Sequence, residues 1–199
     1  MMSIEGVIVA AGLSQRTGTY KMTLKIGDTT VIEKCLEGMY DLCSRIIVVG
    51  GYKFENLIPV LDQYEKVELV LNANYKDGMF SSVKEGFRHV RGERFFFIPG
   101  DYPVVSKQVY ETMGNVEGDI IIPAYHGEKG HPVLINGYLA SELVEDTVCT
   151  SLREFINTRG FTLVNVQDPG ILQDIDTMDD YKKIVKWVKV HAGSIVPGE

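Results

Sequence analysis

The sequence lacks most of the features that assign a protein to a class at first sight. Its three cysteines, Cys35, Cys43 and Cys149, form no CxxC pair, which removes the common zinc-binding and dithiol patterns. No apolar run is long enough to cross a bilayer, and no basic segment precedes an apolar stretch at the start. With 20 basic against 27 acidic residues and a net charge of −7, the chain has no general basic surface for nucleic acid. We expect a cytoplasmic protein with neither a membrane nor a nucleic-acid partner.

Two nucleotide-binding fingerprints are also missing. The chain has no Gly-Lys-Ser/Thr sequence, so the Walker A loop is excluded. It also lacks the glycine spacing of the dinucleotide-binding turn and the acidic residue expected about 20 positions further on. A dinucleotide-dependent oxidoreductase is therefore disfavoured, although a small anionic ligand is not, because a few donors in one loop suffice to bind a phosphate.

What is present is a regular alternation of apolar runs and amphipathic stretches. The length of 199 residues suits one domain, which we expect over residues 1–192, followed by a flexible tail over residues 193–199. The predicted strands cover residues 6–10, 45–49, 67–71, 94–98, 119–124, 131–135 and 162–166. Several are almost wholly apolar, as expected for strands that are covered on both faces. The alternation predicts an α/β fold, three-layered and Rossmann-like, with a doubly wound, mostly parallel sheet.

The helical pattern is clearest in two segments. Apolar residues recur at every fourth position from Val31 to Cys43, which predicts a helix in which Cys35 and Cys43 are small buried side chains. Thr177 and Asp180 have the spacing of a capping box at the start of a final helix. Ligands of such folds bind at the carboxyl ends of the strands, so the loops there are the place to look for chemistry.

The first of these loops follows the strand at residues 6–10 and contains small and basic residues. Gly12 and its alanine neighbours allow a sharp turn and a close approach of the backbone to a ligand. Backbone N–H groups in such a turn can cradle phosphates, with Arg16 and Lys21 as the cations. The alternative is a glycine turn with two solvated basic side chains.

Acidic residues follow two other predicted strands. Asp101 lies in a Gly-Asp-Tyr-Pro turn after the strand at residues 94–98, and Asp174 and Asp176 follow the strand at residues 162–166. Carboxylate oxygens are ligands that Mg²⁺ prefers. A lone aspartate in such a turn is more often only a turn residue, and the alternative for the second pair is a helix capped by Thr177 with both carboxylates in solvent. Together with the basic loop, they predict a phosphate site facing a carboxylate pair.

The order of these motifs resembles that of the NTP-transferase-like family. The matching strings are residues 9–16 (VAAGLSQR), Lys21, residues 77–82 (DGMFSS), 100–103 (GDYP), 130–132 (GHP) and 174–177 (DIDT). Within the family, they are most similar to molybdenum cofactor cytidylyltransferases and related guanylyltransferases. The resemblance implies the nucleotide-diphospho-sugar transferase type of fold and transfer of a nucleoside monophosphate to a phosphate-bearing acceptor such as molybdopterin, with release of pyrophosphate.

The resemblance also implies roles for individual residues. Arg16, Lys21 and Asp101 would be catalytic, and Mg²⁺, the implied cofactor, would be held by Asp101 and Asp176, with Asp174 as the alternative second ligand. The nucleotide would be bound by Ala10, Ala11, Gly12, Leu13, Ser14, Arg16, Lys21, Ser81, Ser82 and Gly100. His131 and Pro132 would bind the acceptor. The Ala-Ala-Gly sequence at residues 10–12 goes with CTP in this family, whereas Ala-Gly-Gly goes with GTP. A molybdenum hydroxylase is the implied downstream partner.

Several alternatives remain open. The chain could act on a sugar phosphate or polyol phosphate instead, or be a non-catalytic accessory protein that only holds a nucleotide or the cofactor. His131 is equally explained as a packed or turn-capping side chain. Ser81 and Ser82 are equally explained as the start of a helix.

Overall fold

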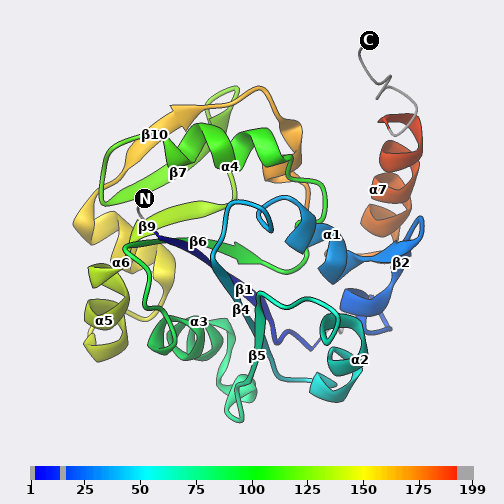
Figure 1. Cartoon of the computed structure of the whole chain (residues 1–199), viewed down its shortest axis with the longest axis horizontal. Coiled ribbons are helices and arrows are strands. Elements are labelled where there is room, and N and C mark those ends of the chain that lie inside the picture. The colour runs from blue at the N-terminus through cyan, green and yellow to red at the C-terminus, as the bar shows by residue number, and fades with distance from the viewer. Residues whose placement is uncertain (1–2, 14–16, 192–199) are drawn as a thin grey trace.

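The computed structural model describes residues 3–13 and 17–191 and is built around one twisted sheet (Figure 1). The eight strands of this sheet are β1 (Ile4–Ala10), β4 (Arg45–Gly50), β5 (Val67–Leu71), β6 (Arg94–Pro99), β7 (Ile120–Tyr125), β8 (Glu128–Lys129), β9 (Val133–Asn136) and β10 (Thr162–Asn165). Each of the seven strands predicted from the apolar runs is present, within two residues at either end.

The sheet is mostly parallel, and β1 lies at its centre. The strand order is β10-β7-β9-β6-β1-β4-β5, with β8 paired to β7. β1 runs parallel to β4 and β6, whereas β9 is antiparallel to both of its neighbours, β6 and β7. Because of this reversal, the start of β9 lies at the edge of the sheet where the parallel strands end. The predicted α/β class and mostly parallel sheet are confirmed.

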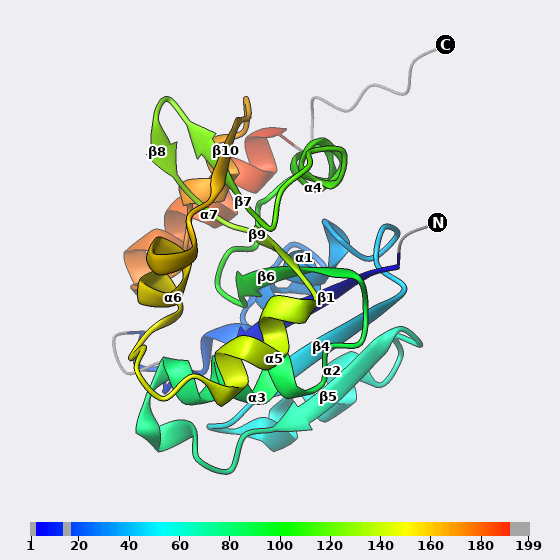
Figure 2. The ribbon, with the colours of Figure 1, turned by 90° about the vertical axis from the view of Figure 1, so that its left-hand side faces the viewer.

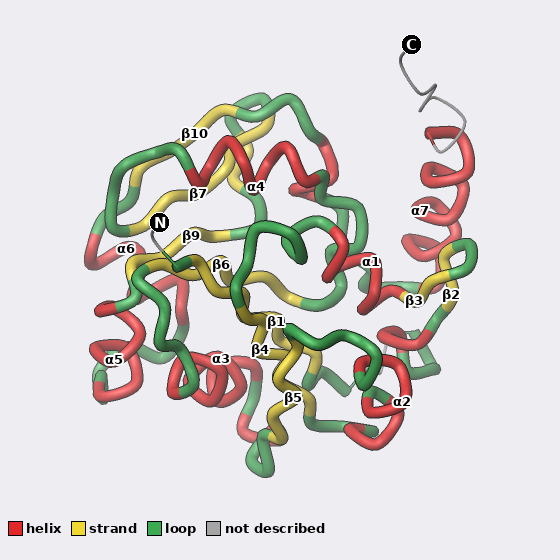
Figure 3. Tube along the Cα trace, in the orientation of Figure 1, coloured by secondary structure: helices red, strands yellow, loops and turns green. Residues whose placement is uncertain are grey.

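Helices cover both faces of the sheet, as the apolar strands require (Figures 2 and 3). One face packs against α1 (Val31–Glu37), α2 (Ile58–Leu61) and α4 (Lys107–Gly114). The other packs against α3 (Met79–Arg88), α5 (Tyr138–Glu145) and α6 (Leu152–Arg159). Alternate residues of β1 serve the two cores: Ile8 points to the first and Val7 to the second. The three layers follow from this alternation.

The first predicted helix is shorter than expected. α1 ends at Glu37, and the apolar residues beyond it continue in turns in which the Cys43 N–H donates to the Met39 carbonyl at 3.0 Å. At Gly38 an added Cβ would lie 2.8 Å from the Tyr110 ring and 2.8 Å from the Val105 carbonyl oxygen. These close contacts lie at the point where α1 ends. Cys35 and Cys43 are buried, as predicted.

The final helix, α7 (Met178–His191), packs beside a small hairpin rather than on the main sheet. The hairpin consists of β2 (Lys25–Ile26) and β3 (Thr29–Thr30). Ile26, Ile175 and Ile184 belong to a separate small core that joins the hairpin to α7 and the segment before it. The Thr177 hydroxyl accepts from the Asp180 N–H at 3.2 Å, and the Asp180 carboxylate accepts from the Thr177 N–H at 3.0 Å. The predicted capping box is therefore present.

Short 3₁₀ helices complete the fold. These helices are η1 (Lys21–Thr23), η2 (Phe54–Asn56), η3 (Tyr75–Asp77) and η4 (Pro169–Leu172). Within the described ranges, no helix has the length and apolarity needed to cross a membrane. The single domain over residues 1–192 stays a prediction, and the tail predicted at residues 193–199 lies outside the described part of the chain.

Candidate active site

A hollow of about 350 Å³ opens where β1 and β6 end and α3 begins. We call it the first hollow. Of the residues predicted to bind nucleotide or metal, those that line it are Ala11, Gly12, Leu13, Lys21, Ser82, Asp101 and Asp176. They come from four separate parts of the sequence, and the topology brings them together because parallel strands end at one edge of the sheet.

Lys21 and Asp101 form the central contact of this hollow. The Lys21 Nζ lies 2.5 Å from the Asp101 Oδ2, and it also donates to the Ile175 carbonyl at 2.8 Å. Both side chains are largely buried, with 11% and 14% of their surface exposed. The carboxylate holds the lysine side chain in a fixed position, where it can face an anionic ligand.

One carboxylate oxygen of Asp101, Oδ1, is buried and has no hydrogen-bond partner among the described residues. A buried carboxylate oxygen without a donor is costly, and such exceptions call for an explanation such as an ion. The backbone of the turn is fixed by the Gly100 N–H, which donates to the Val9 carbonyl at 2.9 Å, and by the Ile175 N–H, which donates to the Asp101 carbonyl at 3.0 Å. The free oxygen therefore has a defined position.

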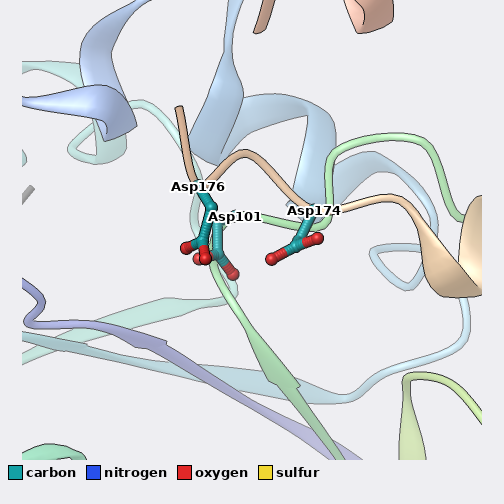
Figure 4. A group of neighbouring side chains, drawn as sticks. All are labelled: Asp101, Asp174 and Asp176. Atoms are coloured by element: carbon teal, nitrogen blue, oxygen red, sulfur yellow. The ribbon is translucent and has the colours of Figure 1, made fainter. Parts of the chain in front are cut away.

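Three carboxylates meet at this point (Figure 4). One oxygen each of Asp101, Asp174 and Asp176 lies within 4.8 Å of the others. Burial, with the like charges of Asp101 and Asp176, raises the pKa of Asp174 above its ordinary value. Hard oxygen ligands at this spacing suit a divalent cation such as Mg²⁺. The donor set and the unpartnered Asp101 oxygen both fit a metal.

The glycine-containing loop lies against the open side of the first hollow. A Cβ added at Gly12 would meet no atom of the described residues within 4 Å. Ala11 instead packs closely: a Cβ on Gly51, at the end of β4, would lie 3.0 Å from the Ala11 Cβ. Ser14 and Arg16, both predicted to bind the nucleotide, lie outside the described residues.

Three of the described residues predicted to contact nucleotide do not line the first hollow: Ala10, Ser81 and Gly100. Ala10 is buried, and its carbonyl accepts from the Tyr20 hydroxyl at 3.4 Å. Gly100 is packed from the core side, since a Cβ there would lie 3.1 Å from the Met22 sulfur and 3.2 Å from Ile32. Both residues lie where a strand ends, Ala10 at the end of β1 and Gly100 directly after β6.

The two serines at the start of α3 have different surroundings. Ser82 is 1% exposed and lines the first hollow, whereas the Ser81 hydroxyl donates toward the Gly78 and Asn74 carbonyls. The Asn72 amide donates to both serine hydroxyls at 2.9 Å and thereby ties the helix start to the end of β5. A structural role accounts for the contacts of Ser81.

His131 and Pro132, which were predicted to bind the acceptor, lie directly before β9. Pro132 is buried, and His131 lines a second hollow of about 660 Å³. The His131 ring meets Tyr102 edge to face at 4.8 Å between centroids and Phe97 at 6.1 Å. Burial, and to a smaller extent the charge of Arg153, lowers the pKa of His131 to about 4, so the ring is neutral near pH 7. We keep the name second hollow for this space.

Some lining residues have no counterpart in the reasoning from sequence. Thr17, Tyr75 and Lys76 line the first hollow, and Arg153 lines the second. Tyr75 and Lys76 belong to η3, directly before the predicted 77–82 segment, so their nearness to that motif was an available signal. Arg153 lies in α6, where no motif was found.

The fold and the carboxylate-lined hollow at its strand ends are those of a nucleotidyltransferase, an enzyme class in which a nucleotide is transferred. The profile of the MobA-like NTP transferase domain matches residues 6–163, which is more than half of the chain. The chain therefore belongs to the MobA-like NTP transferase family.

Individual relatives agree with this assignment. The chain is 29% identical over 182 residues to the molybdenum cofactor cytidylyltransferase of Escherichia coli (strain K12), covering 91% of this chain and 95% of that protein. It is 27% identical to a probable molybdenum cofactor guanylyltransferase of Bacillus cytotoxicus over 65% of this chain and 66% of that protein. The solved structure of a nucleotidyl transferase from Methanothermobacter thermautotroptrophicus superposes with a TM-score of 0.79 at 24% identity, covering 93% of this chain and 97% of that one. At this identity the superposition supports the fold.

Proposed function

We propose that this nucleotidyltransferase moves CMP from CTP to a phosphate-bearing acceptor of the molybdopterin type, with Mg²⁺ as cofactor and pyrophosphate as the second product. The observation that carries the proposal is the convergence of Lys21 with the carboxylates of Asp101 and Asp176 in the first hollow. A triphosphate that enters this hollow meets a fixed ammonium group beside a carboxylate cluster that can hold a metal.

The reaction needs little from the protein beyond position and charge. An acceptor phosphate is already an anionic nucleophile, so in-line attack on the α-phosphorus requires no protein base. Lys21 would balance the negative charge that builds up on the α-phosphoryl group and on the departing pyrophosphate. Arg16, by resemblance, would share this role. Asp101 and Asp176 would hold Mg²⁺, which when bound neutralises phosphate charge and orients the triphosphate.

His131 is assigned to the acceptor and not to proton transfer. Its ring lines the second hollow, whereas Ala11 and Gly12 line the first, and Pro99 lines both. Its pKa of about 4 leaves the ring neutral near pH 7. An acceptor that occupies the second hollow would present its phosphate toward the first, since Met79 and Pro99 line both spaces.

CTP is favoured over GTP by two observations. The loop reads Ala10-Ala11-Gly12, the sequence that goes with CTP among the resembling proteins. The relative matched over 91% of this chain is a cytidylyltransferase, whereas the guanylyltransferase match covers 65%. Delivery of the product to a molybdenum hydroxylase stays a prediction from resemblance.

The test is transfer of label from the α-phosphate of CTP or GTP to molybdopterin, with Mg²⁺ and with a chelator. We expect Mg²⁺-dependent incorporation, faster from CTP than from GTP. Incorporation into sugar phosphates or polyol phosphates but not molybdopterin would identify the alternative acceptor class. Nucleotide binding without incorporation under any condition would contradict the proposal and favour the accessory protein.

A further inference from the structure

Part of the first hollow is lined by η3 and the start of α3. The lining residues from this segment are Tyr75, Lys76, Gly78, Met79 and Ser82. The chain turns into α3 at Gly78, which has a φ of 97° and, as the N-cap residue, no side chain to bind the first N–H groups of the helix. The position of this part of the lining therefore depends on other side chains.

Asn72, directly after β5, is the buried side chain that joins these parts. It is 3% exposed and lines neither hollow. Its backbone N–H donates to the Gly50 carbonyl, at the end of β4, at 2.9 Å, and its Oδ1 accepts from the Asn74 N–H at 2.9 Å. Because a backbone N–H can only donate, the second bond fixes the orientation of the amide, and the Nδ2 amino group faces α3.

The two N–H groups of this amide are both used. The Ser81 and Ser82 hydroxyl oxygens each accept from Nδ2 at 2.9 Å. A hydroxyl that accepts a hydrogen bond still has its own proton to donate. Ser81 donates toward the Gly78 carbonyl at 2.8 Å and the Asn74 carbonyl at 3.0 Å. The Ser82 hydroxyl has no acceptor among the described residues, and its side chain lines the first hollow.

We infer that Asn72 is a positioning residue for nucleotide binding: it holds the Ser82 oxygen as an acceptor, so that the Ser82 O–H is presented to an oxygen atom of the nucleotide in the first hollow. The inference rests on the proposed function and adds to it a residue that itself touches no ligand. An amide suits this role because it combines two N–H donors with one acceptor in a single plane. A carboxylate of the same shape would keep the acceptor and lose both donors.

The first test is therefore Asn72→Asp. The substitution preserves the bond from the Asn74 N–H, but the new carboxylate can only accept hydrogen bonds from the serines. The Ser82 hydroxyl then donates to this carboxylate, and its lone pairs instead of its proton face the nucleotide. We expect the Kd for CTP, measured by titration calorimetry with Mg²⁺ and without acceptor, to rise about tenfold, as for the loss of one hydrogen bond. Ser82→Ala removes the same donor directly and should raise the Kd about equally.

The double variant separates an effect through Ser82 from a general effect on the fold or charge of the site. Once Ser82→Ala has removed the hydroxyl, Asn72→Asp should raise the Kd further by less than about threefold, because the contact through which it acts is gone. A loss of packing, or the added negative charge, would act in both backgrounds. The two single effects would then multiply to about a hundredfold.

Two further variants serve as comparisons. Ser81→Ala removes the other acceptor of the same amide and should weaken CTP binding less than Ser82→Ala, since Ser81 does not line the first hollow. Asn115→Asp adds the same charge at an exposed asparagine after α4, whose amide donates to the Glu111 carbonyl at 2.9 Å, and should bind CTP like the wild type. Urea unfolding without ligand checks that each variant is folded. If Asn72→Asp does not fold, the comparison of Ser82→Ala with Ser81→Ala decides.

The outcomes separate this inference from the proposed function. Wild-type affinity for CTP in Ser82→Ala, equal affinities for Ser82→Ala and Ser81→Ala, or a double variant whose effect is the product of the single effects would overturn the inference even if CMP transfer is observed. The expected results for CTP binding, together with no transfer to molybdopterin, would count against the proposed function alone. No binding of CTP by the wild type would overturn both.

Discussion

Buried carboxylates lie at both ends of the parallel strands of the central sheet, and we call these ends its two edges. The hydrogen-bond partners of the carboxylates differ between the two edges. At the edge where β1 begins, both carboxylate oxygens of Glu5 are paired: Oε1 accepts from the Arg45 guanidinium at 3.0 Å and Oε2 from the Arg91 N–H at 2.8 Å. Arg45 also binds Glu68 at 2.6 Å and donates to the His89 carbonyl. At the opposite edge, Asp101 has one buried oxygen without a partner among the described residues, and one oxygen each of Asp101, Asp174 and Asp176 lies within 4.8 Å of the others.

This contrast separates a stabilising charge cluster from a site that is prepared for a ligand. Burial tends to raise the pKa of Glu5, but the hydrogen bonds from Arg91, Gly92 and Arg45 outweigh it and the pKa is lowered. The pKa of Asp174 is raised by burial and by its like-charged neighbours. Glu5 therefore favours its charged form, whereas Asp174 favours loss of charge or the arrival of a cation.

The largest effect is expected from Asp101→Asn. The substitution keeps the shape of the side chain but removes a proposed metal ligand and the partner of Lys21. We expect pyrophosphate release to fall about 10²–10³-fold, the usual cost of removing one preorganised charge from a transition state.

The control for this prediction is Asp41→Asn, which removes an exposed aspartate that pairs with Lys107 outside the site. Pyrophosphate release by Asp41→Asn should match the wild type. Near wild-type release by a folded Asp101→Asn protein would show that the carboxylate edge is not the reaction site.

The second effect concerns stability at the other edge. Glu5→Gln removes the charge that pairs with Arg45 and leaves the guanidinium with fewer acceptors. We expect the free energy of unfolding to fall by about 1–3 kcal/mol, with kcat unchanged in the folded protein. Urea unfolding measures the first and a turnover assay the second. Glu37→Gln, which breaks an exposed pair with Lys34, should cost much less.

The third effect is the dependence of the free energy of unfolding on pH, to which the two edges contribute with opposite signs. Because the folded pKa of Glu5 is lowered, its contribution to stability is complete above the ordinary glutamate pKa of 4.5 and is lost as the pH falls through the folded value. Asp174 has a raised pKa, so protonation at low pH relieves repulsion there. In urea unfolding, Glu5→Gln should therefore lose stability less steeply than the wild type below pH 4.5. If stability falls with pH equally steeply in Glu5→Gln and in the wild type, Glu5 does not contribute to the pH dependence.

The smallest effect is expected from Asp174→Asn in the metal-free protein. Removing a carboxylate whose pKa is raised relieves repulsion from Asp101 and Asp176, so the free energy of unfolding at pH 7 should rise. The rise should be less than about 1 kcal/mol, because the group is partly solvated. Thermal unfolding without metal measures it. A loss of stability would mean that the three carboxylates do not repel one another as described.

The sequence predicts the strands well because most of them are compact apolar runs; β1, β4, β6 and β7 are almost wholly buried, whereas β5 and β10 are partly exposed. It does not predict the direction of β9, since an apolar run reads the same for parallel and antiparallel strands. The end of α1 was also wrong, because the apolar step of four continues to Cys43 while the close contacts of Gly38 with Tyr110 and Val105 are set by tertiary packing.

The motifs of the site can be predicted from the sequence, but the contacts between their side chains cannot. The motifs containing Lys21, Asp101 and Asp176 indicate the correct edge of the sheet. The direct contact between Lys21 and Asp101, 80 positions apart, depends on the three-dimensional path of the chain. Arg153 could not be predicted as a lining residue. The sequence of α6 does not distinguish a side chain that lines a hollow from one that points into solvent.

The most direct test of the contrast between the two edges is the position of a bound metal. Crystals grown with Mn²⁺ and a non-hydrolysable CTP analogue would locate the ion by its anomalous scattering. The account predicts a peak within bonding distance of the Asp101 and Asp176 carboxylates, with the triphosphate facing Lys21. A fully occupied peak elsewhere, or a triphosphate bound away from the first hollow, would contradict it.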